Sequence, residues 1–242
     1  MLQLNQVSKV IQEKQILENI TFSVEAGEFV TLIGPSGSGK STIFSLIGGM
    51  LAPDSGDISL RKQSIIKQRG HISYMPQEDT LFPWRTVLQN ILLVQELQGN
   101  ADQEKAYRML HKAGLQSVTH AYPYELSGGM KQRVSFIRAL LSPQSLLCLD
   151  EPFSALDEFT RMDMQQWLLS IWKQSNASIL FVTHHIEEAL FLSDKIVVLT
   201  EAPGEVKGML EIPFSRPRKR NLLLTEEFLK WKKQVLNMIW RT

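Results

Sequence analysis

The chain has 242 residues, 43% of them hydrophobic and 21% charged, which is ordinary for a globular protein with one substantial core. Lys and Arg total 26 against 25 Asp and Glu, so no basic excess indicates binding to nucleic acid. One cysteine, Cys148, excludes an intramolecular disulfide, and no apolar run reaches the roughly 20 residues needed to span a bilayer. If the protein serves a membrane process, we expect a partner to supply the membrane part.

Strand patterns dominate the first third of the chain. Apolar and polar residues alternate over 2–7 and again over 20–24, as in half-buried strands, and residues 29–33 predict a fully buried strand. A glycine-rich loop follows directly. Further elements expected here are a helix over 41–50 and short strands over 57–60 and 71–75.

The period of the pattern changes from about residue 86 to residue 141. Apolar residues such as Val87, Ile91 and Val94 recur at helical spacing, which predicts a helical insertion between strands. Strands and helices then alternate, and this rhythm favours a mostly parallel sheet covered on both faces. The expected elements are strands over 146–149, 178–183 and 195–200 and helices over 159–174, 185–192 and 225–240.

The glycine-rich loop fits the phosphate-binding pattern G-x-x-x-x-G-K-[ST] and lies between a predicted strand and a predicted helix. Glycines let consecutive backbone N–H groups surround a phosphate, and the following helix directs its positive end at the same anion. Lys40 is suited to reach the β- and γ-phosphates, and the hydroxyl of Ser41 to bind Mg²⁺. An ordinary glycine-rich turn is the alternative. The residues assigned to this site are Gly34, Pro35, Ser36, Gly37, Ser38, Gly39, Lys40, Ser41 and Thr42.

Two carboxylates, Asp150 and Glu151, follow the apolar run 146–149 and precede Pro152. Ligands of open α/β sheets bind at the carboxyl ends of the strands, where these side chains are expected. Asp150 is suited to hold Mg²⁺ through a coordinated water, and Glu151 to accept a proton from an attacking water. An acidic turn ended by proline is the alternative, and Cys148 is interpreted as an apolar core residue.

A third motif opens an amphipathic helix with the sequence Leu126-Ser127-Gly128-Gly129-Met130-Lys131-Gln132-Arg133. Ser127 is a natural N-cap, and Gly128 and Gly129 leave the backbone N–H groups open to an anion. Taken alone, the stretch is also explained by an ordinary capped helix without a bound anion.

Together, these three motifs resemble those of ABC ATPases, and the stretch 126–132 is similar to the signature motif of that family. The resemblance implies that Gln77 is the glutamine that senses Mg²⁺ and the membrane partner. It also implies that Asp157, in Ser-Ala-Leu-Asp, belongs to the D-loop, and that His184 is the switch histidine that contacts the γ-phosphate.

The implied fold is α/β: a P-loop NTPase (RecA-like) core with a mostly parallel sheet, an N-terminal antiparallel β subdomain and an inserted helical subdomain. We expect the core over 1–85 and 142–215 and the helical subdomain over 86–141. Residues 216–242 are expected to form a basic linker and a C-terminal helix.

The family resemblance also implies cofactors and partners. ATP and Mg²⁺ are the cofactors, and two copies bind head to tail, each closing its Ser127 helix start on the nucleotide held by the other. Hydrolysis of the shared γ-phosphate then changes the spacing of the subunits. Integral membrane permease subunits and a solute-binding protein complete such an importer, with the ATPase on the cytoplasmic face of the membrane.

Within the family, residues 81–87 and Arg216-Pro217-Arg218 resemble importers of the nitrate, sulfonate and taurine type. Importers of thiamine-precursor pyrimidines have much the same ATPase, so the cargo stays open. Alternatives of other classes are a soluble ABC ATPase acting on DNA or ribosomes and a nucleotide-binding regulator without turnover.

Two positions depart from the family pattern. The aromatic residue that stacks on adenine is replaced by Val10-Ile11, so Ile11 predicts apolar contact with the base and little selectivity for ATP over GTP. His185 follows the switch histidine in place of the usual aspartate, and it is interpreted as the start of the next helix.

Three surface regions allow two interpretations each. Phe82, Trp84 and Leu88 are candidates for a groove that receives a permease helix, or for core packing. The last helix is expected to pack its apolar stripe on its own domain rather than on lipid. The basic run 216–220 predicts a solvated linker, with attraction to anionic lipid as the alternative.

Overall fold

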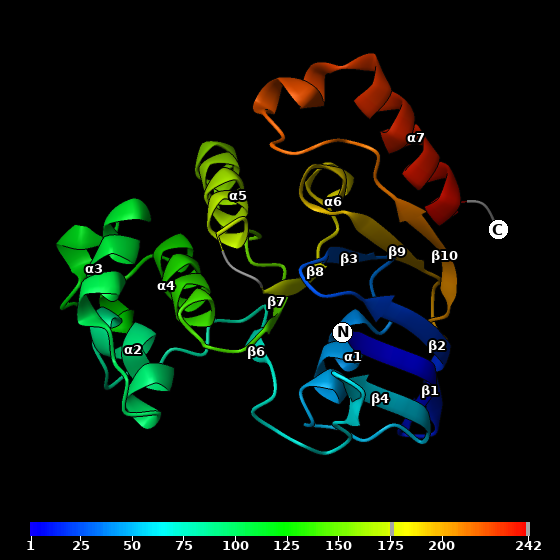
Figure 1. Cartoon of the computed structure of the whole chain (residues 1–242), viewed down its shortest axis with the longest axis horizontal. Coiled ribbons are helices and arrows are strands. Elements are labelled where there is room, and N and C mark those ends of the chain that lie inside the picture. The colour runs from blue at the N-terminus through cyan, green and yellow to red at the C-terminus, as the bar shows by residue number, and fades with distance from the viewer. Residues whose placement is uncertain (175–176, 241–242) are drawn as a thin grey trace. The chain divides into compact units, whose positions relative to one another are not determined.

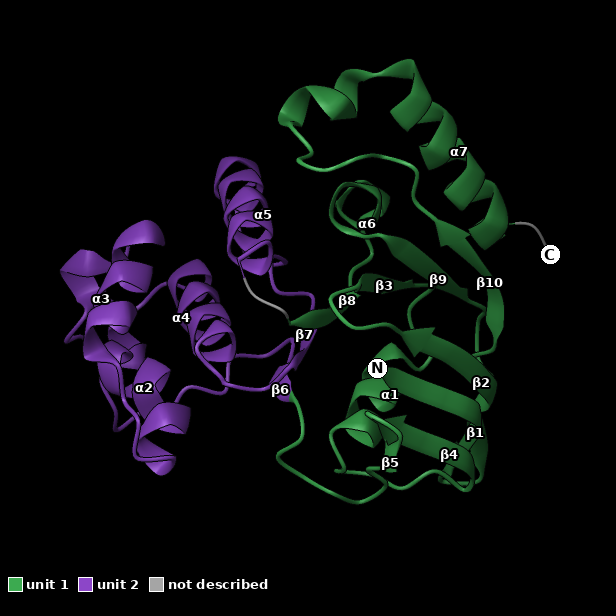
Figure 2. Cartoon of the chain, in the orientation of Figure 1, with its two compact units in different colours: residues 1–72, 176–242 green, residues 73–175 purple. Residues whose placement is uncertain are grey.

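The computed structural model describes residues 1–174 and 177–240, which form two compact units (Figure 2). Unit 1 comprises Met1–Ile72 and Asn176–Thr242, and unit 2 comprises Ser73–Ser175. The expected division into a core over 1–85 and 142–215 and a helical part over 86–141 stays a prediction. The mixed α/β fold class is confirmed.

Unit 1 begins with an antiparallel sheet in the strand order β2-β1-β4-β5 (Figures 1 and 2). Strand β1 pairs antiparallel with β2 and with β4, and its residues Leu2, Leu4 and Val7 are buried, with a register irregularity between Leu4 and Val7. The alternation in the sequence therefore places one face of the sheet in the core. The strands are β1 (Leu2–Ile11), β2 (Lys14–Val24), β4 (Ser55–Leu60) and β5 (Gln63–Ser64).

A second group of strands in unit 1 carries the sequence-predicted parallel pairing. Strand β3 (Phe29–Ile33) pairs parallel with β8 (Ser178–Val182) on one side and with β9 (Lys195–Leu199) on the other. Every residue of β3 and β8 is buried, as continuous apolar runs of parallel strands predict. Strand β10 (Val206–Glu211), which the sequence did not indicate, pairs antiparallel with β9.

Among the described residues of unit 1, the helices are α1 (Lys40–Ile47), α6 (Ile186–Leu192) and α7 (Glu226–Trp240), with a short 3-10 helix η3 (Arg220–Leu224) before α7. The apolar stripe of α7 packs on its own unit, as expected. Phe228 and Val235 are buried in one cluster with Ile33, Leu190 and Phe214.

Unit 2 has a short parallel pair, β6 (Ser73–Met75) and β7 (Leu146–Asp150). Its helices are α2 (Val87–Leu97), α3 (Gln103–Lys112), α4 (Gly128–Leu140) and α5 (Glu158–Trp172), with the 3-10 helices η1 (Gln116–Val118) and η2 (Pro123–Glu125). Thr86 begins α2 with a capping box to Gln89. The predicted helical insertion is thus present as α2, α3 and α4.

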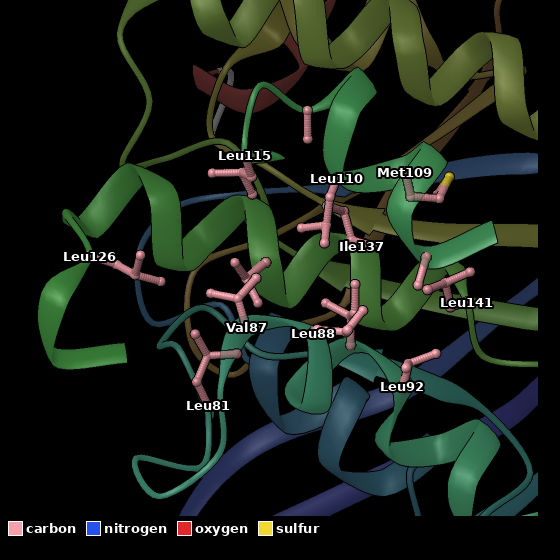
Figure 3. Packing of buried hydrophobic residues seen from close by; sticks show 14 residues of the cluster. Leu81, Val87, Leu88, Leu92, Met109, Leu110, Leu115, Leu126, Ile137 and Leu141 are labelled. Carbon is pink, nitrogen blue, oxygen red and sulfur yellow. The ribbon is translucent and has the colours of Figure 1, made fainter. Parts of the chain in front are cut away.

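The helices of unit 2 bury one apolar cluster, to which α2, α3 and α4 all contribute (Figure 3). Leu88 belongs to this cluster, so core packing explains it. Trp84, by contrast, is 70% exposed and lies against the half-buried Phe82 with ring centroids 5.2 Å apart. Of the three groove candidates, Trp84 is the one left open to a partner.

The basic run after β10 corrects an expectation. The sequence predicted a solvated linker over residues 216–220, but the side chain of Arg218 is buried and Arg216 is half-buried in an ion pair with Asp194. A charged group enters a core only with partners, and these come from a distant part of the sequence. Within the described ranges, 1–174 and 177–240, none of the helices has the length and apolar character needed to cross a membrane.

Candidate active site

The phosphate loop of unit 1 connects β3, which ends at Ile33, to α1, which begins at Lys40. The Lys40 ammonium lies 2.9 Å from the carbonyl oxygen of Gly34, 2.8 Å from that of Pro35 and 3.2 Å from Ser38 Oγ. Gly39 precedes the helix with a left-handed backbone (φ 84°), a conformation that glycine adopts without strain. The loop thus holds a cation beside a helix start that has no acidic residue in its first turn.

The remaining residues assigned to the phosphate site lie where the motif predicts them. Ser36 and Gly37 are exposed at the tip of the loop, while Ser38 is fully buried beneath it. Ser41 and Thr42 follow Lys40 in the first turn of α1, where Ser41 is exposed. This arrangement can bind an anion through backbone N–H groups, the helix start and one ammonium.

Gly204, which the sequence did not single out, supports this loop from below. A Cβ added there would lie 2.2 Å from the Ser38 carbonyl oxygen, so only glycine fits. Two backbone hydrogen bonds fix the position of Gly204. The Gly204 N–H donates to the Ile16 carbonyl, and the Gly204 carbonyl accepts from the Glu18 N–H, both at 2.9 Å. No sequence motif marks this position.

The switch segment of unit 1 lies between β8 and α6. His184 is exposed, and its ring centroid is 5.7 Å from that of His185, which is the N-cap residue of α6 and so lies at the start of the next helix, as expected. Thr183 Oγ1 donates to Glu188 Oε2 at 2.5 Å and accepts from the His185 N–H at 3.0 Å. The backbone on the C-terminal side of His184 is therefore tied to the first turn of α6.

The acidic pair lies in unit 2 at the carboxyl end of β7. Asp150 is the last residue of the strand and is 2% exposed, and Glu151 is 8% exposed. Gln77 Nε2 donates to Glu151 Oε2 at 3.0 Å. The register explains this contact, because Met75 of β6 pairs with Leu149 of β7, and Gln77 and Glu151 both follow two residues later.

Glu151 also has an unusual backbone conformation. Its φ of 48° lies in the left-handed region, which costs a non-glycine residue about 1–2 kcal/mol. Such strain persists where the surroundings enforce it, often at a site of chemistry. Nearby Cys148 is fully buried, and burial raises the pKa of its thiol, so it acts as an apolar core residue.

The serine-glycine helix of unit 2 begins as predicted. Ser127 Oγ accepts from the Met130 N–H at 3.3 Å, and Gly128 and Gly129 form the first turn of α4. Asp157 caps the next helix, α5, by accepting from the Thr160 N–H at 3.0 Å; its hydrogen bonds to Thr160 lower the pKa of its carboxyl group. The role of Asp157 towards a nucleotide stays a prediction.

Gln132 of α4 links these parts, although only the resemblance to the signature motif covered it. Its Nε2 donates to the Glu151 carbonyl and to Ser154 Oγ, both at 3.0 Å, and its Oε1 accepts from the Ala155 N–H at 2.9 Å. The signature helix, the acidic loop and the D-loop are thereby joined through one buried side chain.

The predicted base contact lies at the end of β1 in unit 1. Val10 is 40% and Ile11 36% exposed, a large exposed fraction for aliphatic side chains. Asp54 holds this strand end by accepting from the Val10 N–H at 2.6 Å and from Lys9 Nζ at 2.9 Å; these bonds lower the pKa of the Asp54 carboxyl group. An apolar surface is thus available to a base.

The donor set predicted for Mg²⁺ is chemically suitable. Ser41, Gln77 and Asp150 offer a hydroxyl, an amide carbonyl and a carboxylate, which are the hard oxygen ligands that Mg²⁺ prefers. Within residues 1–174 and 177–240, there is no group of three or more His, Cys, Asp or Glu side chains that could hold a metal ion. Mg²⁺ needs no such group when substrate phosphates and water complete its shell.

Comparison with known proteins identifies the family of this chain. The family model described as ABC transporter matches residues 17–154. The chain is 41% identical over 237 residues to the aliphatic sulfonates import ATP-binding protein of a Bacillus cereus strain, covering 96% of this chain and 93% of that protein. It is also 41% identical over 215 residues to the formylaminopyrimidine import ATP-binding protein of Halalkalibacterium halodurans, covering 88% and 83%.

Among solved structures, the chain resembles a dimeric ATP-binding cassette in a post-hydrolysis state with ADP and Pi bound. The TM-score is 0.79 at 28% identity, over 89% of this chain and 100% of that one. The chain therefore belongs to the ABC transporter family, as an ATP-binding and ATP-hydrolysing subunit of the importer type.

Proposed function

We propose that this chain hydrolyses ATP with Mg²⁺ to drive the uptake of a small solute through a separate permease. The observation that carries the hydrolytic assignment is the placement of Glu151. It follows a buried strand, is held by Gln77 at 3.0 Å and has a strained backbone. A carboxylate fixed in this way is suited to take a proton from an attacking water.

The other site residues have distinct tasks in this mechanism. The backbone N–H groups of residues 34–39 and the start of α1 bind the phosphates, and Lys40 neutralises charge at the β- and γ-phosphates. Gln77 orients Glu151, and His184 contacts the γ-phosphate. Ser41, Gln77 and Asp150 would hold Mg²⁺, which would neutralise the charge that develops on the phosphate oxygens.

The second half of the nucleotide site comes from another copy of the chain. The capped start of α4 at Ser127 presents open N–H groups to an anion, and the resemblance places it on the γ-phosphate bound by the partner copy. The solved dimer with ADP and Pi supports this arrangement. When the γ-phosphate is cleaved, the attraction between the two positive surfaces weakens, and the subunits separate.

The partners and the cargo follow from the relatives. A permease in the membrane, a solute-binding protein and two copies of this chain on the cytoplasmic face would form the importer. Import proteins for aliphatic sulfonates and for formylaminopyrimidine match at the same identity, 41%. We favour small anions of the sulfonate, nitrate and taurine type because residues 81–87 and the Arg-Pro-Arg stretch resemble that group, and a pyrimidine cargo is the alternative.

Substitution of Glu151 tests the mechanism. Glu151→Gln keeps the shape of the side chain but removes the base, so kcat for ATP hydrolysis should fall by about 10²–10⁴-fold. The variant should also accumulate as a dimer with ATP, which size-exclusion chromatography detects. Glu158→Gln, an exposed acid in the first turn of α5, is the control and should hydrolyse normally. Hydrolysis by Glu151→Gln at the wild-type rate would remove Glu151 from the mechanism.

A further inference from the structure

Two arginines that follow β10 bind the C-terminal end of α6. Arg218 donates from Nε to the Phe214 carbonyl at 3.0 Å and from Nη1 to the carbonyls of Leu190, Phe191 and Ser193 at 3.2, 3.0 and 2.7 Å. Arg216 Nη2 donates to the Leu192 carbonyl at 2.6 Å. The last carbonyls of a helix have no partner within it, and a cation there also complements the helix dipole.

Arg216 is also tied to β3 through Asp194. Arg216 donates to Asp194 Oδ1 from Nε at 2.9 Å and from Nη2 at 2.7 Å. Asp194 also exchanges hydrogen bonds with Phe29, the first residue of β3: Oδ2 accepts from the Phe29 N–H at 3.0 Å, and the Asp194 N–H donates to the Phe29 carbonyl at 2.8 Å. The arginine clamp, defined as Arg216, Arg218 and Asp194, therefore fixes one end of α6 and one end of β3.

The opposite ends of these two elements carry site residues. Strand β3 runs from Phe29 to Ile33 and leads into the phosphate loop, and α6 begins immediately after His184 and His185. Helix α6 has only seven residues and is about 10 Å long, so it moves as one short rigid rod. A shift at its clamped end is therefore carried to the end next to His184.

Contacts at the N-terminal end of α6 complete this connection. Glu188 accepts from Thr183, the residue before His184, and Lys232 of α7 donates to Glu187 Oε1 at 2.6 Å. The chain after residue 213 thus contacts α6 at both ends, through Lys232 at one end and through Arg218 at the other.

Arg218 is well suited to be a permanent part of the clamp. Burial, and secondly the neighbouring charge of Arg216, lowers its pKa to about 10, so the guanidinium remains charged at neutral pH. A buried charge without partners is strongly unfavourable, but here four carbonyl oxygens receive its hydrogen bonds. Lys has one charged nitrogen in place of this planar fork and cannot satisfy the same set of carbonyls.

We propose that Arg218 is a positioning residue for His184: together with Arg216 it sets the position of α6, and thereby the reach of the switch histidine to the γ-phosphate. The inference rests on the proposed role of His184. Misplacement of a catalytic group by about 1 Å costs up to roughly 10²-fold in rate. Loss of the fork in Arg218→Lys should therefore lower kcat by about tenfold and leave the KM for ATP within about threefold.

Two control variants separate this effect from general loss of stability. Lys219→Ala removes an exposed cation from the same basic run and should leave kcat unchanged. Leu4→Ala empties a buried position in the antiparallel sheet, so it should lower the melting temperature without changing kcat below that temperature. Circular dichroism identifies the temperature range in which every variant is folded.

The decisive experiment is a double-mutant cycle with His184→Ala, using single-turnover ATP hydrolysis to measure the slow rates. If Arg218 acts through His184, adding Arg218→Lys to His184→Ala should cause no further loss of rate. An equal loss in both backgrounds, or an unchanged kcat in folded Arg218→Lys, overturns the proposal. Should Arg218→Lys fail to fold, Arg216→Lys at the half-buried part of the clamp replaces it in the same cycle.

Failure of the underlying assignment gives a different result. If His184→Ala alone hydrolyses ATP at the wild-type rate, the switch role of His184 is wrong, and the proposal for Arg218 is overturned with it. If His184→Ala is slow but the two losses multiply, the role of His184 stands and only its coupling to Arg218 is refuted.

Discussion

A methyl group at Gly204 should damage ATP binding from beneath the phosphate loop. The Cβ of Gly204→Ala would lie 2.2 Å from the Ser38 carbonyl oxygen, whereas ordinary contacts begin at 3.4 Å, so the two segments must separate by about 1 Å. Gly204 is held by two backbone hydrogen bonds to the strand segment at Ile16 and Glu18, whereas the phosphate loop has exposed residues, Ser36 and Gly37, at its tip. The shift therefore falls largely on the phosphate loop.

The size of the effect follows from the hydrogen bonds that the loop makes to phosphate. A displacement of this size breaks one or two charge-assisted bonds, each worth about 1.5–3 kcal/mol. The Kd for ATP, measured by isothermal titration calorimetry, should therefore rise by roughly 10–100-fold or more. The unfolding free energy should also fall, by about 1–3 kcal/mol, because overpacking strains the backbone.

Gly27→Ala is the matched control for this variant. Gly27 has a left-handed backbone (φ 72°) with nothing within 4 Å of an added Cβ, so alanine there costs about 1–2 kcal/mol of strain and touches no neighbour. Both variants should lose stability, but only Gly204→Ala should lose affinity. A folded Gly204→Ala protein that binds ATP as tightly as the wild type would show that the loop yields without losing its geometry, and the reasoning would be refuted.

Two further changes test the nucleotide site. Lys40→Ala removes the ammonium that Gly34, Pro35 and Ser38 hold over the loop, so ATP binding should be lost in calorimetry, and normal affinity would contradict the phosphate-loop assignment. Replacing ATP by GTP should give similar turnover, because Val10 and Ile11 offer apolar contact without aromatic stacking. A preference for ATP above about 100-fold would show that another residue stacks on the base; such a ratio corresponds to about 2.7 kcal/mol.

The sequence by itself determined the parts of the site whose chemistry lies within a few consecutive residues. The phosphate loop needs glycines, one lysine and a helix start, and all of them lie between Gly34 and Thr42. The cap at Ser127 and the carboxylates after β7 are equally local. Their position at strand ends and helix starts follows from hydrophobic periodicity, which the structure reproduces within a few residues at β3, β7 and α4.

Only the tertiary structure decided which distant residues support those motifs. Gln77 meets Glu151 because β6 and β7 pair in parallel with Met75 opposite Leu149, and no local pattern specifies that register. Position 204 requires glycine because the phosphate loop at Ser38 passes so close that a Cβ would clash with it. The sequence around residue 204 does not reveal this approach.

The basic run 216–220 shows most clearly why the sequence alone could not predict which of its charged side chains is buried. Arg-Pro-Arg-Lys-Arg predicts a solvated linker, because burying a charge is unfavourable unless partners compensate for its lost hydration. The compensating carbonyls are at the end of α6, 25 to 28 residues earlier in the chain. Hydrophobic and turn patterns are local properties that a sequence displays directly, whereas the burial of Arg218 depends on where folding places the unpaired carbonyls of another helix.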